Sequence, residues 1–425
     1  MSSRVIENTS KACMIGDMFW NKKLSKRIFL DYASMTPIDP RVLEKMKECE
    51  SYFLTNPSAL YSEGLKAKDK VTEAKSRIAK VLGTQKETII CTSGGTEGNN
   101  LALLGVFEAC KTENFIPHII TTSIEHPSVL EVCKEIEKRG GEVTYVPVGE
   151  NGLINAKDIS NAIKSNTVLV SVMYANNEIG TIEPLHEISR VIKDWRHYMS
   201  KRHFDIENSP EGTPRGRLPY FHTDACQAVL YQELNVMKLG VDMMTMDGIK
   251  MYGPRGVGLL YLKNGLPIKP ILFGGGQQNG LRSGTENVSG IVGLAYALEI
   301  ANEMRQNESE RLTLIRDYGI EQILKTFPNA TLNGSEKNRL PNNINICFPN
   351  LDAEFAVISL DVAGISASYS SSCRTLSENS SSYVVSALGK PGCSSSSLRF
   401  TLGRESTKGD IDNLILALQK IIKQN

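Results

Sequence analysis

The chain has 425 residues, with 48 Lys and Arg against 47 Asp and Glu, and 41% of its residues are hydrophobic. This composition is typical of a globular protein with a large core, and it excludes collagen, a coiled coil and disorder of the whole chain. A net charge of +1 gives no reason to expect a nucleic acid or a membrane surface as a partner.

The nine cysteines include no CxxC pair, so the sequence predicts free thiols rather than a zinc site or a disulfide framework, and we expect no metal. No apolar run approaches the roughly 20 residues that span a bilayer. Residues 1–27 carry charges of both signs and no continuous apolar segment, which favours an N-terminal extension over a secretory signal. We expect a cytoplasmic protein, and a mitochondrion or related organelle stays open as the alternative.

Strand-like and helix-like patterns alternate through the first two thirds of the chain. Helices are predicted over 66–82 and 127–138, and strands over 118–126, 142–148, 167–175, 220–225, 242–248 and 256–262. The stretch 87–109 is predicted to form a strand, a Gly-rich turn and then a helix. Short apolar strands that end in polar residues and lead into helices are typical of a mostly parallel, doubly wound α/β sheet. Such sheets bind ligands at the carboxyl ends of their strands.

The pattern changes near residue 290, where a smaller α+β domain is predicted. Its elements are a long helix over 290–326, strands over 342–348 and 396–404, and helices over 352–362 and 408–423. We therefore expect an extension at 1–27, a large domain at 28–288, whose first residues could pack on the small domain, and a small domain at 289–425. The polar stretch 196–218 is interpreted as a surface insertion, and the serine-rich stretch 366–382 as a mobile loop.

Three positions in the large domain carry candidate chemistry. The turn from Ser93 to Glu97 lies between a strand and a helix, and it fits either an anion site or a plain Gly-rich turn with a threonine cap. Asp224 ends a strand, where it could cap a helix or pair with the ring nitrogen of a pyridine cofactor. Lys250 follows another strand end, a suitable place for a Schiff base, although most lysines are solvated surface charges.

The turn, the aspartate and the lysine follow one another along the chain as they do in fold-type I pyridoxal-phosphate (PLP) enzymes, which this sequence resembles. The sequence from about residue 28 to the C-terminus is similar to the cysteine desulfurases of the NifS/IscS type, in the class V aminotransferase superfamily. The matching stretches are FLDYASMTPIDPRVLEKM (29–46), CTSGGTEGNNLAL (91–103), EHPSVLEVC (125–133), VSVMYANNEIGTI (170–182), FHTDACQAV (221–229), KMYGPRGVGLLYL (250–262), GGGQQNGLRSGTENVSGIVGLA (274–295) and SSLRFTLGRES (396–406).

The resemblance assigns the main catalytic roles. It implies that Lys250 forms the Schiff base with PLP, that Asp224 pairs with the ring nitrogen and that Gln227 donates to the ring hydroxyl. His126 matches the imidazole that stacks on the ring and assists proton transfers. Cys373 matches the loop cysteine whose thiolate takes sulfur from the substrate, which leaves a persulfide on the enzyme and L-alanine as product.

Further matches concern the ends of the cofactor and the substrate. Gly95 and Thr96 match the phosphate-binding turn, and Asn177 matches an asparagine near cofactor and substrate. Arg399 matches the arginine that binds the substrate carboxylate. Thr285 matches a threonine that reaches the phosphate of the neighbouring subunit, which implies a homodimer.

Three departures from the family pattern bear on activity, and the predicted insertion at 196–218 is one of them. The usual Ser-x-His before the lysine is replaced by Asp247, Gly248 and Ile249, which puts an acidic residue near the cofactor phosphate and predicts weakened PLP binding. The glycine usual before the loop cysteine is also absent, since Tyr369 is followed by three serines and Cys373.

The favoured function is PLP-dependent desulfuration of L-cysteine, with sulfur passed to an iron–sulfur scaffold or to tRNA thiolation through another acceptor protein. A selenocysteine lyase or another class V PLP enzyme remains an alternative. A non-catalytic homologue that serves as a scaffold is the other alternative, and the altered residues before Lys250 are the reason to keep it.

Overall fold

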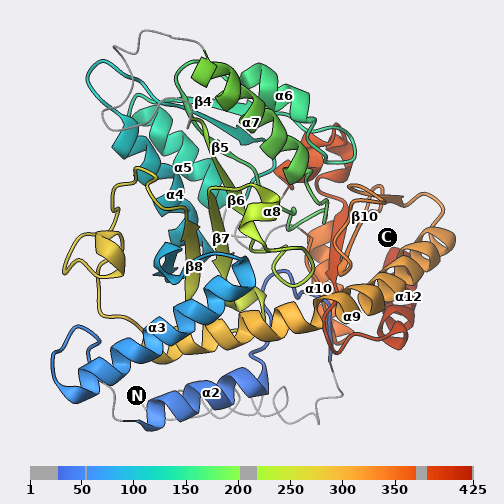
Figure 1. The fold of residues 1–425 in the computed structure, drawn as a ribbon. Helices are drawn as coiled ribbons and strands as arrows, with labels where there is room; N and C mark the ends of the chain where they lie inside the picture. Colours follow the sequence, from blue (N-terminus) through green and yellow to red (C-terminus); the bar gives the residue numbers. More distant parts are fainter. Residues whose placement is uncertain (1–26, 53–54, 202–217, 370–380, 424–425) are drawn as a thin grey trace, which may run out of the picture.

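The computed structural model describes residues 27–52, 55–201, 218–369 and 381–423. Its centre is a seven-stranded sheet in the order β2-β8-β7-β6-β5-β3-β4 (Figure 1). The strands are β2 (Ile89–Thr92), β3 (His118–Thr122), β4 (Glu142–Val146), β5 (Thr167–Ser171), β6 (Tyr220–Asp224), β7 (Met243–Asp247) and β8 (Gly258–Leu262). All pairs are parallel except those of β8, which runs antiparallel to β2 and β7.

Helices cover both faces of this sheet, because successive side chains of its buried strands point to opposite sides. Ile119, Leu169 and Met243 pack in one cluster with α4 (Gly95–Cys110) and α5 (Pro127–Lys138). Their neighbours Ile120, Val170 and Met244 pack in the other cluster, with α7 (Leu185–Lys201), α8 (Val236–Leu239) and α3 (Ser62–Leu82). The short α6 (Ala156–Ala162) packs on α7. The predicted mostly parallel, doubly wound sheet is therefore confirmed.

A smaller C-terminal part contains two further sheets. β10 (Asn343–Cys347) pairs antiparallel with β9 (Thr331–Leu332) and β12 (Ser397–Thr401), and β1 (Ile28–Phe29) pairs in parallel with β11 (Ile365–Ser366). The remaining helices of this part are α10 (Ala353–Val362), α11 (Tyr383–Ala387) and α12 (Lys408–Ile422).

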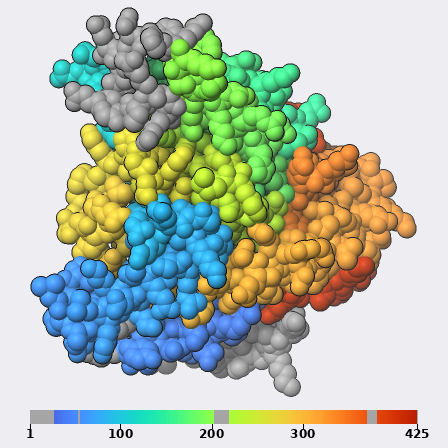
Figure 2. Space-filling view, viewed as in Figure 1, coloured from blue at the N-terminus to red at the C-terminus, as the bar shows by residue number. Residues whose placement is uncertain are grey.

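The long helix α9 (Val288–Thr326) connects the two parts of the molecule. Near its start, Gly293 packs on Met46 of α2 (Pro40–Ser51), and near its end Gly319 packs on Ile344 and Ile411. Figure 2 shows the blue surface of α2 and α3 beside the orange surface of α9, so early and late segments of the chain share one face. No helix within the described ranges is long and apolar enough to cross a membrane.

Two expectations from the sequence are corrected. Residues 196–201 are not part of a surface insertion: they complete α7, and Arg196 is held by the carboxylate of Asp242 at 2.5 Å and by the carbonyl of Pro219. Residues 202–217 of that stretch lie outside the described residues. Cys347 is not a free core thiol, because it forms a disulfide with Cys393 next to the β10–β12 pair.

Candidate active site

Eight of the ten predicted site residues line one pocket at the carboxyl ends of the large sheet. They are Gly95, Thr96, His126, Asn177, Asp224, Gln227, Lys250 and Arg399. Thr285 is exposed and does not line it, and its predicted role towards a second subunit stays a prediction. Cys373 lies outside the described residues.

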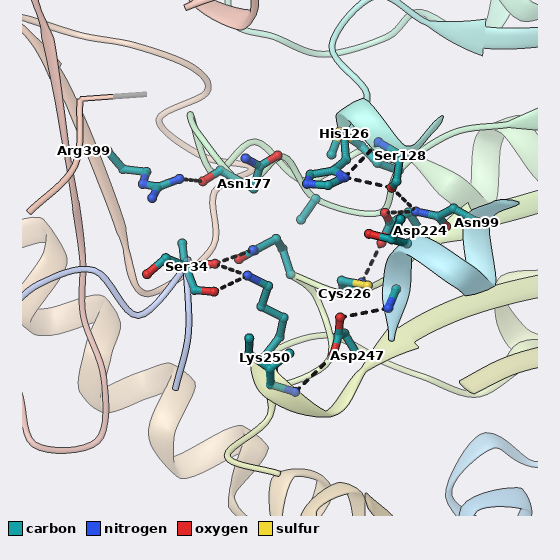
Figure 3. Close-up of a pocket in the computed structure, with 17 residues that line it drawn as sticks. Ser34, Asn99, His126, Ser128, Asn177, Asp224, Cys226, Asp247, Lys250 and Arg399 are labelled. Atoms are coloured by element: carbon teal, nitrogen blue, oxygen red, sulfur yellow. Dashed lines mark hydrogen bonds between the residues drawn. The ribbon is translucent and has the colours of Figure 1, made fainter. Parts of the chain in front are cut away.

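The acidic end of the pocket is built on β6 and α4. Asp224 ends β6, where its Oδ1 accepts the backbone N–H of Cys226 at 2.9 Å and its Oδ2 accepts the side-chain amide of Asn99 at 2.7 Å. Asn99 is buried on α4 and also donates to Ser128 Oγ at 2.9 Å (Figure 3). Asp224 is thus fixed by two donors, which keeps a carboxylate oriented inside the pocket.

His126 sits above this carboxylate as the N-cap of α5. Its Nδ1 accepts the backbone N–H of Ser128 at 3.1 Å, so the proton of the neutral ring is on Nε2. Burial lowers the pKa of His126, which favours the neutral ring. The structure therefore presents an imidazole with a defined tautomer to the pocket.

Lys250 enters the pocket from the turn after β7. Its Nζ donates to the carbonyl oxygens of Ala33 at 2.8 Å and Ser34 at 2.5 Å. Gln227 donates to the same Ala33 carbonyl at 2.9 Å. The segment after β1 therefore holds both side chains at the pocket wall, and its residues Ala33 and Ser34 were not predicted from the sequence.

Arg399 closes the opposite side, from β12 in the small part. Its guanidinium is 2% exposed, donates to the carbonyl of Asn177 at 2.9 Å and binds the carboxylate of Asp31 at 2.7 Å. Within the described ranges, Arg399 Nε and Asn177 Oδ1 are buried without a hydrogen-bond partner. A buried cation with an unused donor suits a small anionic ligand such as a carboxylate.

The start of α4 is closed by an acidic side chain from β7. Asp247 Oδ2 accepts the backbone N–H of Gly95 at 2.8 Å. Thr96 follows on the exposed side of the turn. Asp247 therefore lies against the turn that the resemblance assigns to phosphate binding.

Asn99, Ser128 and Cys226 also belong to the site, although sequence reasoning did not find them. Asn99 lies four residues after Gly95, so both face the same side of α4, and that spacing was a usable signal. Cys226 is half-buried in the pocket wall next to Gly95. Burial raises the pKa of its thiol, so it stays protonated.

The donor set fits PLP at its ring and aldehyde. Lys250 supplies an amine, Asp224 a fixed carboxylate for a pyridine nitrogen and His126 a flat imidazole. At the start of α4, where an anion would bind, the Gly95 N–H is already taken by Asp247. Among the described residues, no cluster of His, Cys, Asp and Glu could hold a metal ion.

Comparison with known proteins finds relatives over most of the chain. The model of the aminotransferase class-V family matches residues 28–200 and 217–414. Cysteine desulfurase IscS of Dictyoglomus turgidum is 41% identical over 402 residues, which cover 94% of this chain and 96% of that protein. Cysteine desulfurase IscS 1 of Archaeoglobus fulgidus is 39% identical over 399 residues, with 93% and 97% covered.

Two solved structures are similar over most of the chain. A NifS-like protein superposes with a TM-score of 0.83 and 31% identity, covering 94% of this chain and 100% of its own. SspA in complex with cysteine superposes with a TM-score of 0.73 and 31% identity, covering 88% and 98%. The chain therefore belongs to the aminotransferase class-V family.

Proposed function

We propose that the protein is a PLP-dependent cysteine desulfurase. The observation that carries this proposal is the joining of Lys250, Asp224, His126 and Arg399 in one pocket. Relatives named cysteine desulfurase at 39% and 41% identity support it.

The pocket residues divide the work between cofactor and substrate. PLP, when bound, withdraws electrons from the Cα of an amino acid. Lys250 would hold the cofactor aldehyde through its amine and move protons at Cα, and Asp224 would keep the ring nitrogen protonated. Arg399 would bind the carboxylate of L-cysteine, while His126 would carry a proton on Nε2.

The sulfur step is assigned to Cys373. Its thiolate would form an S–S bond with the substrate sulfur while the Cβ–S bond breaks. The electron pair of that bond stays with Cβ, which then takes a proton, so that L-cysteine and the thiol give L-alanine and a persulfide. The persulfide would pass to an iron–sulfur scaffold or to an acceptor in tRNA thiolation, and the enzyme would act as a homodimer.

The experiment is a visible absorption spectrum of the purified protein with PLP, followed by L-cysteine and the measurement of alanine and sulfide. We expect a lysine-bound cofactor band that changes on cysteine addition, with alanine formed. Lys250→Ala should remove the band, and Lys134→Ala, on the surface, should not. Binding of PLP without alanine from cysteine would show that the assigned reaction is wrong.

A second candidate is a non-catalytic homologue that does not hold the cofactor. The occupation of the Gly95 N–H by Asp247 favours it, because that group belongs to the anion site of α4. Absence of a cofactor band at saturating PLP would support this candidate.

A further inference from the structure

The carboxylate of Asp247 occupies an anion site that belongs to α4. The first N–H groups of a helix have no partner within the helix and attract anions. Here the chain itself supplies the anion: Asp247 Oδ2 accepts from Gly95, while Oδ1 accepts the N–H of Ile249 at 3.2 Å (Figure 3). A ligand phosphate at this helix end therefore lies beside a carboxylate that already accepts the Gly95 N–H.

Close packing leaves no side chain between the turn and this carboxylate. A Cβ on Gly94 would lie 3.0 Å from Asp247 Oδ2, and a Cβ on Gly95 would lie 2.7 Å from Cys226 Sγ. Gly94 is thus what allows Asp247 to approach the backbone, and Gly95 leaves room for Cys226. A phosphate that uses the same amides must come within direct contact of Asp247.

The groups that face Asp247 supply no net positive charge that would neutralise a phosphate bound beside it. Lys250 and Asp224 act on it from the pocket with opposite charges, and Cys226 is held neutral by burial, which raises its pKa. His126 is buried, which lowers its pKa, and on the first turn of α4 Glu97 is paired with Arg282 at 2.9 Å. Burial raises the pKa of Asp247 before any ligand is present, and a nearby phosphate would raise it further.

We propose that Asp247 determines how this protein binds the cofactor phosphate: the site accepts the phosphate by taking up one proton, which carboxylate and phosphate then share in a hydrogen bond. This rests on the proposed function, because it assumes that a PLP-type ligand enters the pocket. Two anions in contact titrate as a pair, and one shared proton removes most of their repulsion. The affinity for a phosphorylated ligand then falls as the pH rises.

The test compares pyridoxine 5′-phosphate with pyridoxine by calorimetry between pH 7 and pH 9. Neither ligand has an aldehyde, so neither bonds to Lys250, and the ratio of their Kd values isolates the phosphate. In the wild type, the affinity for pyridoxine 5′-phosphate relative to that for pyridoxine should fall about tenfold per pH unit, because binding takes up one proton. Titrations in buffers of different ionisation enthalpy should count about one proton taken up.

Asp247→Asn is the decisive variant, because it keeps the shape of the side chain and removes its charge. It should bind pyridoxine 5′-phosphate about tenfold more tightly than the wild type at pH 8. Its ratio of the two Kd values should not change above pH 7, because the phosphate itself titrates near pH 6. Asp247→Ser is the second variant, with Glu108→Gln at the far end of α4 as the control. Circular dichroism of each variant checks folding.

Equal proton uptake and equal pH slopes in the wild type and in Asp247→Asn would overturn the inference. Alanine formation from cysteine in the same preparation would then leave the proposed function standing. If neither pyridoxine 5′-phosphate nor PLP bound to any of these proteins, the inference and the proposed function would both be wrong.

Discussion

Arg399 and Asp31 form an ion pair at 2.7 Å although 368 residues separate them along the chain. The guanidinium is also held by the Asn177 carbonyl, so the large sheet, the N-terminal segment and β12 meet at one side chain. Arg399 keeps a buried Nε without a partner among the described residues. Its position is therefore fixed by protein contacts while one donor remains for a ligand.

Arg399→Lys should raise the KM for L-cysteine about tenfold or more, because an ammonium cannot bind Asp31 and a substrate carboxylate with the geometry of a guanidinium. Steady-state kinetics of alanine formation measure this. Arg404→Lys is the matched control, since Arg404 pairs with Asp39 outside the pocket and should leave KM unchanged. An unchanged KM in Arg399→Lys would contradict the assignment.

Cys373→Ala should retain the cofactor band and lose the persulfide, because the thiol that accepts the sulfur is gone. Mass spectrometry after a single turnover with cysteine detects the added sulfur on the wild-type chain. Cys110→Ala serves as the comparison, since its thiol is buried at the end of α4, outside the pocket. Undiminished sulfur release by Cys373→Ala would exclude this residue as the acceptor.

Asn99→Ala should weaken PLP binding about tenfold through Asp224. Asn99 is a positioning residue: its amide donates to Asp224 Oδ2 at 2.7 Å, and its loss leaves that buried oxygen without its donor. A fluorescence titration gives the Kd, and a shift of the cofactor band reports the protonation of the ring nitrogen. Asn100→Ala is the control, because among the described residues its amide bonds to the Thr96 carbonyl and not to Asp224. A changed melting temperature with an unchanged band would indicate a structural role alone.

Glu125 should make the protein less stable at alkaline pH. Burial raises its pKa to about 8, so the folded state holds a proton that the unfolded chain releases near pH 4.5. The stabilisation is complete below pH 4.5 and decreases as the pH rises through 8, on the order of 1 kcal/mol between pH 7 and pH 9. Denaturant unfolding at both pH values should show a smaller loss in Glu125→Gln. A loss equal to that of the wild type would refute this pKa assignment.

Reduction of the Cys347–Cys393 disulfide should destabilise the small part of the molecule. The two cysteines are 46 positions apart in the sequence. A disulfide that closes such a loop restricts the unfolded chain, which stabilises the folded state by about 2–4 kcal/mol. Thermal unfolding with and without reductant should differ in the wild type. Cys393→Ser should melt at the lower temperature under both conditions, and a response of this variant to reductant would point to other cysteines.

The strand ends could be predicted from the sequence, because short apolar segments followed by polar residues have one stable arrangement in a sheet covered on both faces. Helix 127–138 was predicted with its observed bounds, and the helix predicted from 66 begins one turn earlier, at Ser62. Asp224 and Lys250 could be assigned to the pocket for the same reason, since Asp224 ends one strand of the large sheet and Lys250 lies in the turn after another.

Contacts between distant segments were decided only by the tertiary structure. The run 256–262 gave no sign that β8 would be antiparallel, and nothing in the periodicity of 196–201 marked it as the end of α7 rather than an insertion. The disulfide depends on β10 and β12 lying side by side. Whether Asp247 faces the Gly95 amide depends on the packing of β7 against the start of α4, because a strand-end side chain takes its direction from its neighbours in space. Local pattern thus determined which residues reach the sheet edge, and packing decided which of them bind one another.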